Sequence, residues 1–392
     1  MESWPPRRGA AQRTHNMLSV LARKHEVRQF CFSRRRGRGT CRTTQHAEIP
    51  GGYRRWRRSD PVAHAVLSIG LRTWPRAPIL GGVALSLTRP PVLRQLLDWA
   101  DVVLVSFPWQ VRYCRALSPN ATLVYASMNV ETEKFRSWAQ AAGDPFSAAA
   151  WLRYVERSER HAVQASDLVL AVSGEDRDGF VSRFGAAPDR VLVVPNGANP
   201  AALSRPAPAE RAAARRLLGL PDRPVALFVG ADIAPNRHGL QWVERLARAT
   251  HRFSFVVAGE VSRHVREPRV IGLGEVPDIE PFLSAADVGL CPIEYGGGTK
   301  TKLLESMAAG LAVVALEHST RGLAVDHGVH LLVAEASTDA LVAALDRLAG
   351  DPDLGERLGR AARALVAERY DWATIGAELS HRLEALEPRR AA

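Results

Sequence analysis

The most informative part of this chain reads Glu294-Tyr295-Gly296-Gly297-Gly298-Thr299-Lys300-Thr301-Lys302-Leu303-Leu304-Glu305-Ser306-Met307-Ala308-Ala309-Gly310. An apolar, strand-like run at 286–293 precedes the three glycines, and a helix-forming segment follows them. Glycine lets a backbone approach a ligand closely, and a helix start presents N–H groups and partial positive charge that suit a phosphate. The pattern therefore predicts an anion-binding bend between a strand and a helix.

Two charged side chains extend this prediction from an anion to a nucleotide sugar. Lys302 and Glu305 are three residues apart, so they share a helix face one turn in. A cation for phosphate beside a carboxylate for sugar hydroxyls is what a nucleotide-sugar pocket requires. A P-loop fits less well, because Thr299 separates Gly298 from Lys300, and no dinucleotide fingerprint opens a first βα unit. From these residues alone, a solvated turn with a chance Lys/Glu pair stays open.

The composition is that of a globular protein with two or three domains. Of its 392 residues, 46% are hydrophobic and 24% are charged. Its four cysteines are scattered without a Cys-x-x-Cys pair, which predicts reduced thiols and a cytoplasmic location rather than a zinc or redox site. No apolar run reaches the roughly 18–20 residues of a membrane span, and the first residues lack a signal-peptide core.

The positive charge is concentrated at the start of the chain. The formal net charge is +11, and residues 1–60 alone hold fifteen Lys/Arg against four Asp/Glu. Basic runs at 34–38 and 54–58 carry this charge. A solvated basic loop, attraction to an anionic membrane surface and nucleic-acid binding are the competing interpretations. Because no nucleic-acid-binding module accompanies the charge, we expect no nucleic-acid partner and keep peripheral contact with the inner membrane face open.

Short β-branched runs alternate with helical segments, which predicts an α/β fold with parallel sheets. A proline-rich, polar segment at 195–208 has the composition of a domain linker. In the first half we expect strands at 27–32, 102–107, 122–126, 168–172 and 191–194, and helices at 14–24, 91–99, 145–165 and 175–184. In the second half we expect strands at 225–229, 253–258, 270–273, 288–292, 312–316 and 330–333, and helices at 210–218, 239–249, 279–285, 301–309, 338–349, 353–367 and 373–386. In the 145–165 helix the charged residues, Glu159 among them, are placed mostly off the apolar stripe.

Taken together, these segments resemble the retaining GT-B glycosyltransferases of the large group 1 superfamily. In the second half the resemblance rests on Leu227–Asn236, Val256–Glu260, Gly274–Val276 with Leu283–Val288, and the opening stretch through Gly310. In the first half it rests on Val124–Glu131, Ser166–Ser173 and Val194–Gly197. It covers most of residues 100–372.

The resemblance implies a GT-B fold, with two Rossmann-like domains of parallel sheets facing across a cleft. Residues 1–200 would form the acceptor domain and 201–372 the nucleotide-sugar donor domain, with 373–392 crossing back onto the first domain. Members normally open with an apolar strand before a glycine loop. Because this chain begins without one, either its start lies upstream or the first sheet lacks its central strand.

The family pattern carries over to individual residues of this chain. Glu305 would bind the ribose hydroxyls, Lys302 would pair with phosphate, and Asn129 would face the transferred sugar; these three form the expected catalytic set. Backbone N–H groups of Gly297, Gly298 and Thr299 would face the pyrophosphate and the sugar. Gly230, Asn236 and Arg237 complete the expected donor site. Gly9, with Arg13 behind it, resembles the remnant of the N-terminal glycine loop.

The chain departs from the common pattern at four positions. Gly297 stands where many members carry the first of two glutamates, Ala231 stands where they carry an arginine, and Met128 replaces a histidine. Asn236-Arg237 lies near the position of a lysine, and Arg237 is a candidate substitute for the missing cation. These departures keep a divergent or non-catalytic nucleotide-binding protein open, and a sugar-nucleotide epimerase or hydrolase is a further alternative.

The resemblance also implies a mechanism. A retaining hexosyltransferase of this kind has no covalent nucleophile; helix amides and Lys302 would stabilise the nucleoside diphosphate as it leaves. Neither a metal nor a cofactor is expected, and Asp351-Pro352-Asp353, an Asp-x-Asp stretch that follows a helix, reads as a helix-capping turn. The acceptor would be a glycan, a lipid or a small molecule.

Overall fold

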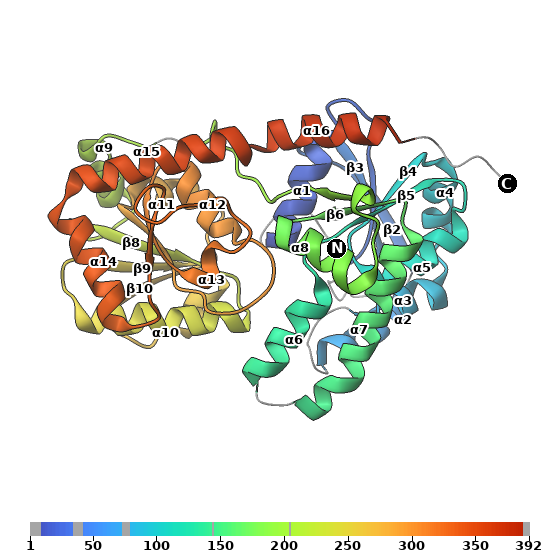
Figure 1. Cartoon of the computed structure of the whole chain (residues 1–392), viewed down its shortest axis with the longest axis horizontal. Coiled ribbons are helices and arrows are strands. Elements are labelled where there is room, and N and C mark those ends of the chain that lie inside the picture. Colours follow the sequence, from blue (N-terminus) through green and yellow to red (C-terminus); the bar gives the residue numbers. More distant parts are fainter. Residues whose placement is uncertain (1–8, 34–41, 73–78, 143–144, 204, 387–392) are drawn as a thin grey trace. The chain divides into compact units, whose positions relative to one another are not determined.

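The computed structural model describes residues 9–33, 42–72, 79–142, 145–203 and 205–386 (Figure 1). Contacts between residues divide the chain into two compact units. The first unit comprises residues 1–195 and 375–392, and the second comprises residues 196–374. Each unit has its own parallel sheet, as the alternation of strands and helices predicts.

The sheet of the second unit holds six parallel strands in the order β10-β9-β8-β11-β12-β13. They are β8 (Val225–Val229), β9 (Ser254–Ala258), β10 (Val270–Gly274), β11 (Val288–Cys291), β12 (Ala312–Leu316) and β13 (Leu332–Ala334). In chain order this is 3-2-1-4-5-6, the order of a doubly wound nucleotide-binding sheet. The order reverses between β8 and β11, and ligands of such sheets bind outside the carboxyl ends of the strands at that point. The strand order therefore predicts a ligand site at the loops after β8 and β11.

Helices bury this sheet from both sides. Every residue of β9, β11 and β12 is buried, which explains why these strands read as continuous apolar runs rather than alternating ones. The helices of this unit are α9 (Pro208–Leu217), α10 (Ala234–Ala249), α11 (Glu280–Ala285), α12 (Thr301–Ala308), α13 (Glu317–Thr320), α14 (Thr338–Gly350) and α15 (Pro352–Arg369), with a 3-10 turn η2 (Glu260–His264).

Glycines fix the position of α12, the helix that follows the glycine-rich loop. A Cβ built on Gly289 of β11 would lie 2.8 Å from the Cβ of Ser306 in α12. At the other end of the helix, Gly310 has φ 73°, and its carbonyl oxygen would lie 2.1 Å from a Cβ on Gly359 of α15. Close backbone approach of this kind requires glycine. As a result α12 is fixed between β11 and α15.

We expect Gly359→Ala to destabilise the second unit by at least about 2 kcal/mol, because the added methyl meets backbone that cannot rotate away. Gly355→Ala, one turn earlier in α15, is the matched control. Its Cβ would meet nothing closer than the Cβ of Ala312 at 3.9 Å. Alanine should therefore stabilise the helix there by roughly 0.5–1 kcal/mol. Thermal unfolding of the full chain measures both, and equal melting temperatures for the two variants would contradict this packing.

The main sheet of the first unit has four parallel strands in the order β4-β5-β6-β7. They are β4 (Val102–Val105), β5 (Thr122–Ala126), β6 (Leu168–Ala171) and β7 (Val191–Val193). The helices are α1 (Gly9–Leu21), α2 (Pro61–Arg72), α3 (Gly81–Thr88), α4 (Pro91–Trp99), α5 (Pro108–Leu117), α6 (Glu131–Ala142), α7 (Pro145–Ala165) and α8 (Gly174–Phe184), with a 3-10 turn η1 (Pro188–Arg190). From Ile375 onward, α16 (Trp372–Glu384) belongs to this unit, where Ser380 Oγ lies 2.6 Å from His25 Nε2 (Figure 1).

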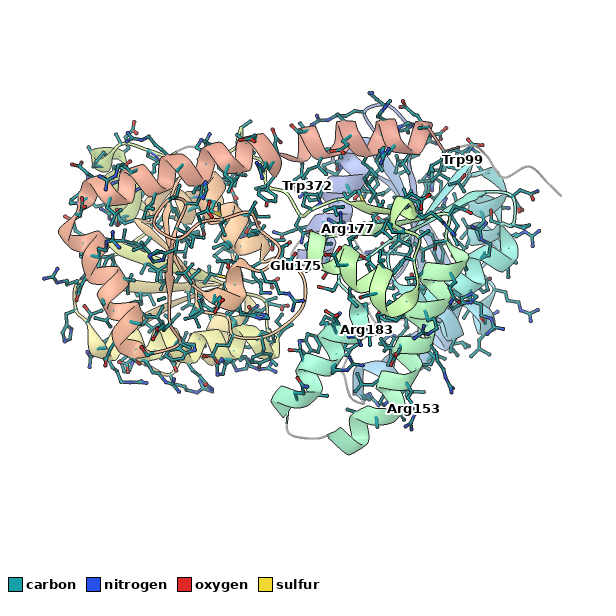
Figure 2. All side chains as sticks on the ribbon, in the orientation of Figure 1. Trp99, Arg153, Glu175, Arg177, Arg183 and Trp372 are labelled. Carbon is teal, nitrogen blue, oxygen red and sulfur yellow. The ribbon has the colours of Figure 1, made fainter. Side chains whose placement is uncertain are left out.

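The basic run 54–58 forms a strand, so its interpretation as a solvated loop was wrong. It is the middle of β3 (Tyr53–Ser59), which pairs in parallel with β1 (Arg28–Phe32) and antiparallel with β2 (Thr43–Ile49). Carboxylates partly neutralise the arginines of this sheet: Arg54 pairs with Glu26 at 3.0 Å and Arg58 with Asp60 at 3.2 Å. The Arg28 guanidinium lies 3.8 Å from the ring centre of Trp99, which Figure 2 labels. The other basic run, 34–38, lies outside the described residues.

Four helices of the first unit, α2, α3, α5 and α6, were not predicted. Proline at the first helical position is a start signal, and it marks α5 at Pro108, where we had extended the strand at 102–107 too far. Gly82 lets α3 pack closely against α5, since a Cβ on it would lie 1.9 Å from the Trp109 carbonyl oxygen. Among the described residues, no helix has the length and apolar character needed to cross a bilayer.

Candidate functional site

The three glycines lie beyond the carboxyl end of β11, at the point where the strand order of the second sheet reverses. Gly296 (φ 116°) and Gly298 (φ 63°) adopt backbone conformations that favour glycine. Helix α12 then begins at Thr301, and its N-cap residue, Lys300, supplies no side-chain cap. An uncapped helix start at the carboxyl ends of parallel strands is suited to an anionic group.

Three side chains hold the glycine-rich loop. Asn196 Nδ2 donates to the buried Thr299 Oγ1 at 2.7 Å, and Lys300 Nζ donates to the Gly298 carbonyl at 2.9 Å. His318 Nε2 lies 2.9 Å from the Gly296 carbonyl oxygen, and burial lowers the pKa of its imidazole. The ring is therefore neutral and donates from Nε2. The loop is fixed before any ligand binds.

Lys302 brings a cation to this loop. Its Nζ donates to Asn236 Oδ1 at 2.6 Å and lies 4.5 Å from the ring centre of Phe228. Burial lowers the pKa of Lys302 to about 8. Asn236 is fixed in turn, because its Nδ2 donates to the Ala231 carbonyl at 2.9 Å. Gly230 makes room for this amide, since a Cβ there would lie 3.1 Å from Asn236 Cγ.

The other two charged residues of the predicted donor site have different surroundings. Glu305 is partly buried on α12, where its negative charge favours the protonated form of Lys302. The Arg237 guanidinium instead pairs with Asp232 at 2.7 Å. Asp232 also contacts His264 Nε2 at 2.9 Å, and hydrogen bonds from Arg237 and His264 lower the pKa of this carboxyl against the opposing effect of burial. The structure thus brings Lys302, Asn236 and Glu305 together, with Arg237 held by a carboxylate.

In the first unit, Gly9 and Arg13 belong to a helix rather than to a loop. Gly9 is the first residue of α1. Arg13 is buried and donates to the carbonyls of Val194 (2.7 Å) and Pro195 (2.9 Å), just past β7. Burial lowers the pKa of its guanidinium to about 10, and the charge of Asp176 opposes this shift. Arg13 therefore ties α1 to the carboxyl end of β7.

Asn129 lies between β5 and α6. Its Nδ2 donates to Glu131 Oε1 at 3.0 Å, and Lys134 pairs with Oε2 of the same carboxylate. Asparagine is a common helix cap, and Asn129 lies just before the start of α6. The first N–H groups of α6 instead donate to Glu159 of α7, at 2.7 Å from Glu131 and 2.8 Å from Thr132. Glu159 is thus the residue that accepts from the start of α6.

Glu159 was missed by the sequence analysis, which placed it off the apolar stripe. Its side chain is fully buried, and Tyr125 Oη also donates to Oε1 at 3.3 Å. Burial raises the pKa of Glu159 to about 7, against the opposing effect of its hydrogen bonds. The available signal was spacing: Glu159 follows Val155 by four residues and precedes Ala162 by three, and both of these are buried.

Asn196 and His318 were also missed, because the sequence analysis assigned neither of them a role. Both follow a predicted strand at its carboxyl end, and this position was the signal that pointed to them. Among the described residues, no group of three or more His, Cys, Asp or Glu side chains is arranged to hold a metal ion.

Comparison with known proteins identifies the family. Residues 223–351 match the family model described as "Glycosyl transferases group 1", and residues 8–197 match "Glycosyl transferase 4-like domain". The alpha-maltose-1-phosphate synthase of Mycolicibacterium smegmatis is 30% identical over 337 residues, which cover 76% of this chain and 83% of that protein. The chain belongs to the group 1 glycosyltransferases.

Other proteins are also similar to this glycosyltransferase. The D-inositol 3-phosphate glycosyltransferase of Kribbella flavida is 31% identical over 239 residues, 55% of either chain. Among solved structures, the sucrose-phosphate synthase of Thermosynechococcus elongatus has a TM-score of 0.72 at 17% identity and covers 94% of this chain and 91% of its own. Anabaena Alr3699/HepE, solved in complex with UDP and glucose, has a TM-score of 0.62 at 18% identity, covering 78% of this chain and 83% of its own. The predictions of a glycosyltransferase and of the GT-B fold are therefore confirmed.

The raised pKa of Glu159 predicts how the stability of this glycosyltransferase changes with pH. The folded protein holds the Glu159 proton up to about pH 7, whereas the unfolded chain releases it near pH 4.5. As pH rises through this window the free energy of unfolding should fall, by on the order of 3 kcal/mol from this group. Glu159→Gln removes the titration, so the stability difference between wild type and variant should depend on pH. Parallel stability curves for the two proteins from pH 4.5 to 7 would refute the assignment.

Proposed function

We propose that this glycosyltransferase uses a nucleoside-diphosphate sugar as its donor, bound by the second unit. The observation that carries the proposal is the hydrogen bond between Lys302 Nζ and Asn236 Oδ1. It keeps a partly buried ammonium beside an uncapped helix start, where the strand order of the sheet reverses. Burial lowers the pKa of Lys302, because it removes water that would stabilise the positive charge of the ammonium. A bound diphosphate supplies negative charge in place of that water, so the buried ammonium gains strongly from it.

Residues of the glycine-rich loop and of α12 have proposed roles in donor binding. Backbone N–H groups of Gly297, Gly298 and Thr299 would hold the pyrophosphate, and Lys302 would bind it as a point charge. Glu305 would accept hydrogen bonds from the ribose hydroxyls. Arg237 would have to leave Asp232 to reach a phosphate, so we assign the main charge neutralisation to Lys302.

The proposed reaction is transfer with retention of configuration. The bond between the anomeric carbon of the sugar and the β-phosphate oxygen breaks, and negative charge grows on that oxygen. Lys302 and the amides at the start of α12 would stabilise this charge, so we assign no metal to the step. The acceptor hydroxyl would attack from the face of the leaving phosphate and pass its proton to that phosphate. Asn129 would hydrogen-bond a hydroxyl of the transferred sugar.

For the acceptor we propose a glycan, a lipid or a small molecule. The names of the relatives, a maltose-1-phosphate synthase and an inositol 3-phosphate glycosyltransferase, favour hydroxyl acceptors that carry phosphate. The Alr3699/HepE complex with UDP supports a nucleoside-diphosphate donor. The arginines of the sheet β1-β3-β2 support peripheral contact of a cytoplasmic enzyme with an anionic membrane face.

Thermal unfolding tests the donor site. We expect one of UDP, GDP and ADP to raise the melting temperature of the wild type, since a ligand of the folded state stabilises by mass action. The shift should be lost in Lys302→Met and reduced in Glu305→Gln. Glu335→Gln, at an exposed position outside the site, should keep the full shift. With EDTA present, turnover of the matching sugar nucleotide should persist, and NMR of the product should show the anomeric configuration of the donor.

Other outcomes of this experiment separate the alternatives. If none of the three nucleotides stabilises the wild type, the donor assignment fails. Turnover without any acceptor would favour a hydrolase or an epimerase.

Proton uptake gives a second test of Lys302. At pH 8 its amine is about half protonated in the free protein, and a bound diphosphate favours the charged form. Nucleotide binding at pH 8 should therefore take up about half a proton per site, which calorimetry in buffers of different ionisation enthalpy measures. Lys302→Arg is the matched control, because its guanidinium keeps its charge and takes up no proton. Equal uptake in both proteins would assign the proton to another group.

A further inference from the structure

A buried carboxylate from one helix covers the start of another in the first unit. Helix α6 begins after Val130, which has no polar side chain to accept its first N–H groups. Glu159 of α7 accepts from the N–H groups of Glu131 and Thr132 with its two different oxygens, and it is fully buried. A cap usually comes from the residue just before the helix. Here the capping residue, Glu159, lies 28 residues after Glu131 and on another helix. The cap therefore also fixes the position of α6 relative to α7.

The start of α6 determines which way the Asn129 amide points. Glu131 is the first residue of α6, is itself buried, and pairs with Lys134. Both of its oxygens accept hydrogen bonds, Oε2 from Lys134 and Oε1 from Nδ2 of Asn129, which sets the orientation of the Asn129 amide. Its Oδ1 then points away from Glu131. Among the residues that the structure describes, none donates a hydrogen bond to this oxygen, so it can accept from a hydroxyl.

We propose that Glu159 is a positioning residue, which by capping α6 fixes Glu131 and so keeps the Asn129 amide oxygen oriented to accept a sugar hydroxyl. This inference rests on the proposed function, because it gives Asn129 a role in the transfer. It assigns a role in the transfer to Glu159, a buried residue on another helix that acts only through Glu131 and Asn129.

The chemistry of the cap requires two acceptor oxygens. Both oxygens of Glu159 face backbone N–H groups, so the amide of a glutamine would set its NH₂ against one of these donors. An aspartate is one methylene shorter and would not reach both. Charged and titratable groups around Glu159 include Glu131 and Lys134 on α6, Tyr125 on β5 and Asp176 on α8. Of these, Glu131 and Glu159 repel each other, so the ion pair with Lys134 stabilises the arrangement.

An NMR experiment tests the orientation without any ligand. In full-length protein labelled with ¹⁵N-asparagine, the side-chain NH₂ of Asn129 is assigned by its loss in Asn129→Ala. We expect its two proton shifts to move by at least 0.2 ppm in Glu159→Gln, and to titrate with pH in the wild type but not in that variant. Glu156→Gln is the matched control on the same helix. Glu156 is half-exposed and pairs with Arg136 and Arg160, so this variant should leave the Asn129 signals in place.

A double-mutant cycle tests the link to transfer. With the sugar nucleotide whose base stabilises the wild type (UDP-glucose, GDP-mannose or ADP-glucose), Glu159→Gln should lower kcat at least tenfold. KM for the donor and the nucleotide-induced melting shift should be unchanged, because the second unit is intact. In the Asn129→Ala background, Glu159→Gln should cost no further activity.

Three results would overturn the proposal. The first is an Asn129 signal that does not respond to Glu159→Gln, and the second is an additive loss of kcat in the double variant. The third is a Glu159→Gln enzyme with wild-type kcat. If the wild type itself neither binds a nucleotide nor turns over a donor, the proposed function fails instead, and the NMR result still decides the orientation of Asn129.

Discussion

The hydrogen bond from Lys302 to Asn236 joins the two helices on which the candidate site of the second unit depends. Asn236 belongs to the helix after β8 and Lys302 to the helix after β11, so the bond spans the point where the strand order reverses. Its acceptor is a neutral amide, which fixes the ammonium without neutralising it. A carboxylate at the same distance would stabilise the charge more and leave less attraction for a ligand. The site is therefore both rigid and electrostatically incomplete.

The first unit has two further buried titratable side chains near the carboxyl ends of its strands, one a hydrogen-bond donor and the other an acceptor. Arg13 donates to carbonyls just past β7, whereas Glu159 accepts from the first N–H groups of α6. In both cases backbone groups replace the water that the side chain lost on burial. Breaking either arrangement leaves an unsatisfied polar group in the interior, which costs more than losing a surface ion pair.

The sequence was sufficient where local chemistry determines structure. The strand at 225–229, the strand at 312–316 and the helix at 145–165 were predicted with the observed bounds, since runs of β-branched residues and a long amphipathic stripe are local properties. The bend before Lys302 was found for the same reason. The partners of Lys302, Asn129 and Glu159 were not predicted, because Asn236, Glu131 and Thr132 reach them through tertiary packing. Whether a polar side chain bonds to another residue or to water depends on distances in the folded chain. The spacing of residues along one helix or strand does not reveal those distances.

The basic strand β3 is a second case in which tertiary neighbours, rather than the local sequence, determine the structure. Its arginines suggested a loop, yet the neighbours β1 and β2, together with Glu26 and Asp60, make a strand there favourable. Periodicity alone could not reveal this, because the residues that neutralise the charge lie outside the run.

One consequence of this small sheet concerns self-association. Strand β2 is an outer strand, and all of its residues except Ile49 are exposed. An outer strand presents unpaired backbone groups to which another chain can add. A second copy that added to β2 through its own β2 would place its row of arginines two strands away from Arg54, Arg55, Arg57 and Arg58. Like-charge repulsion between the two rows opposes this pairing at low ionic strength, so the net charge at the start of the chain favours solubility.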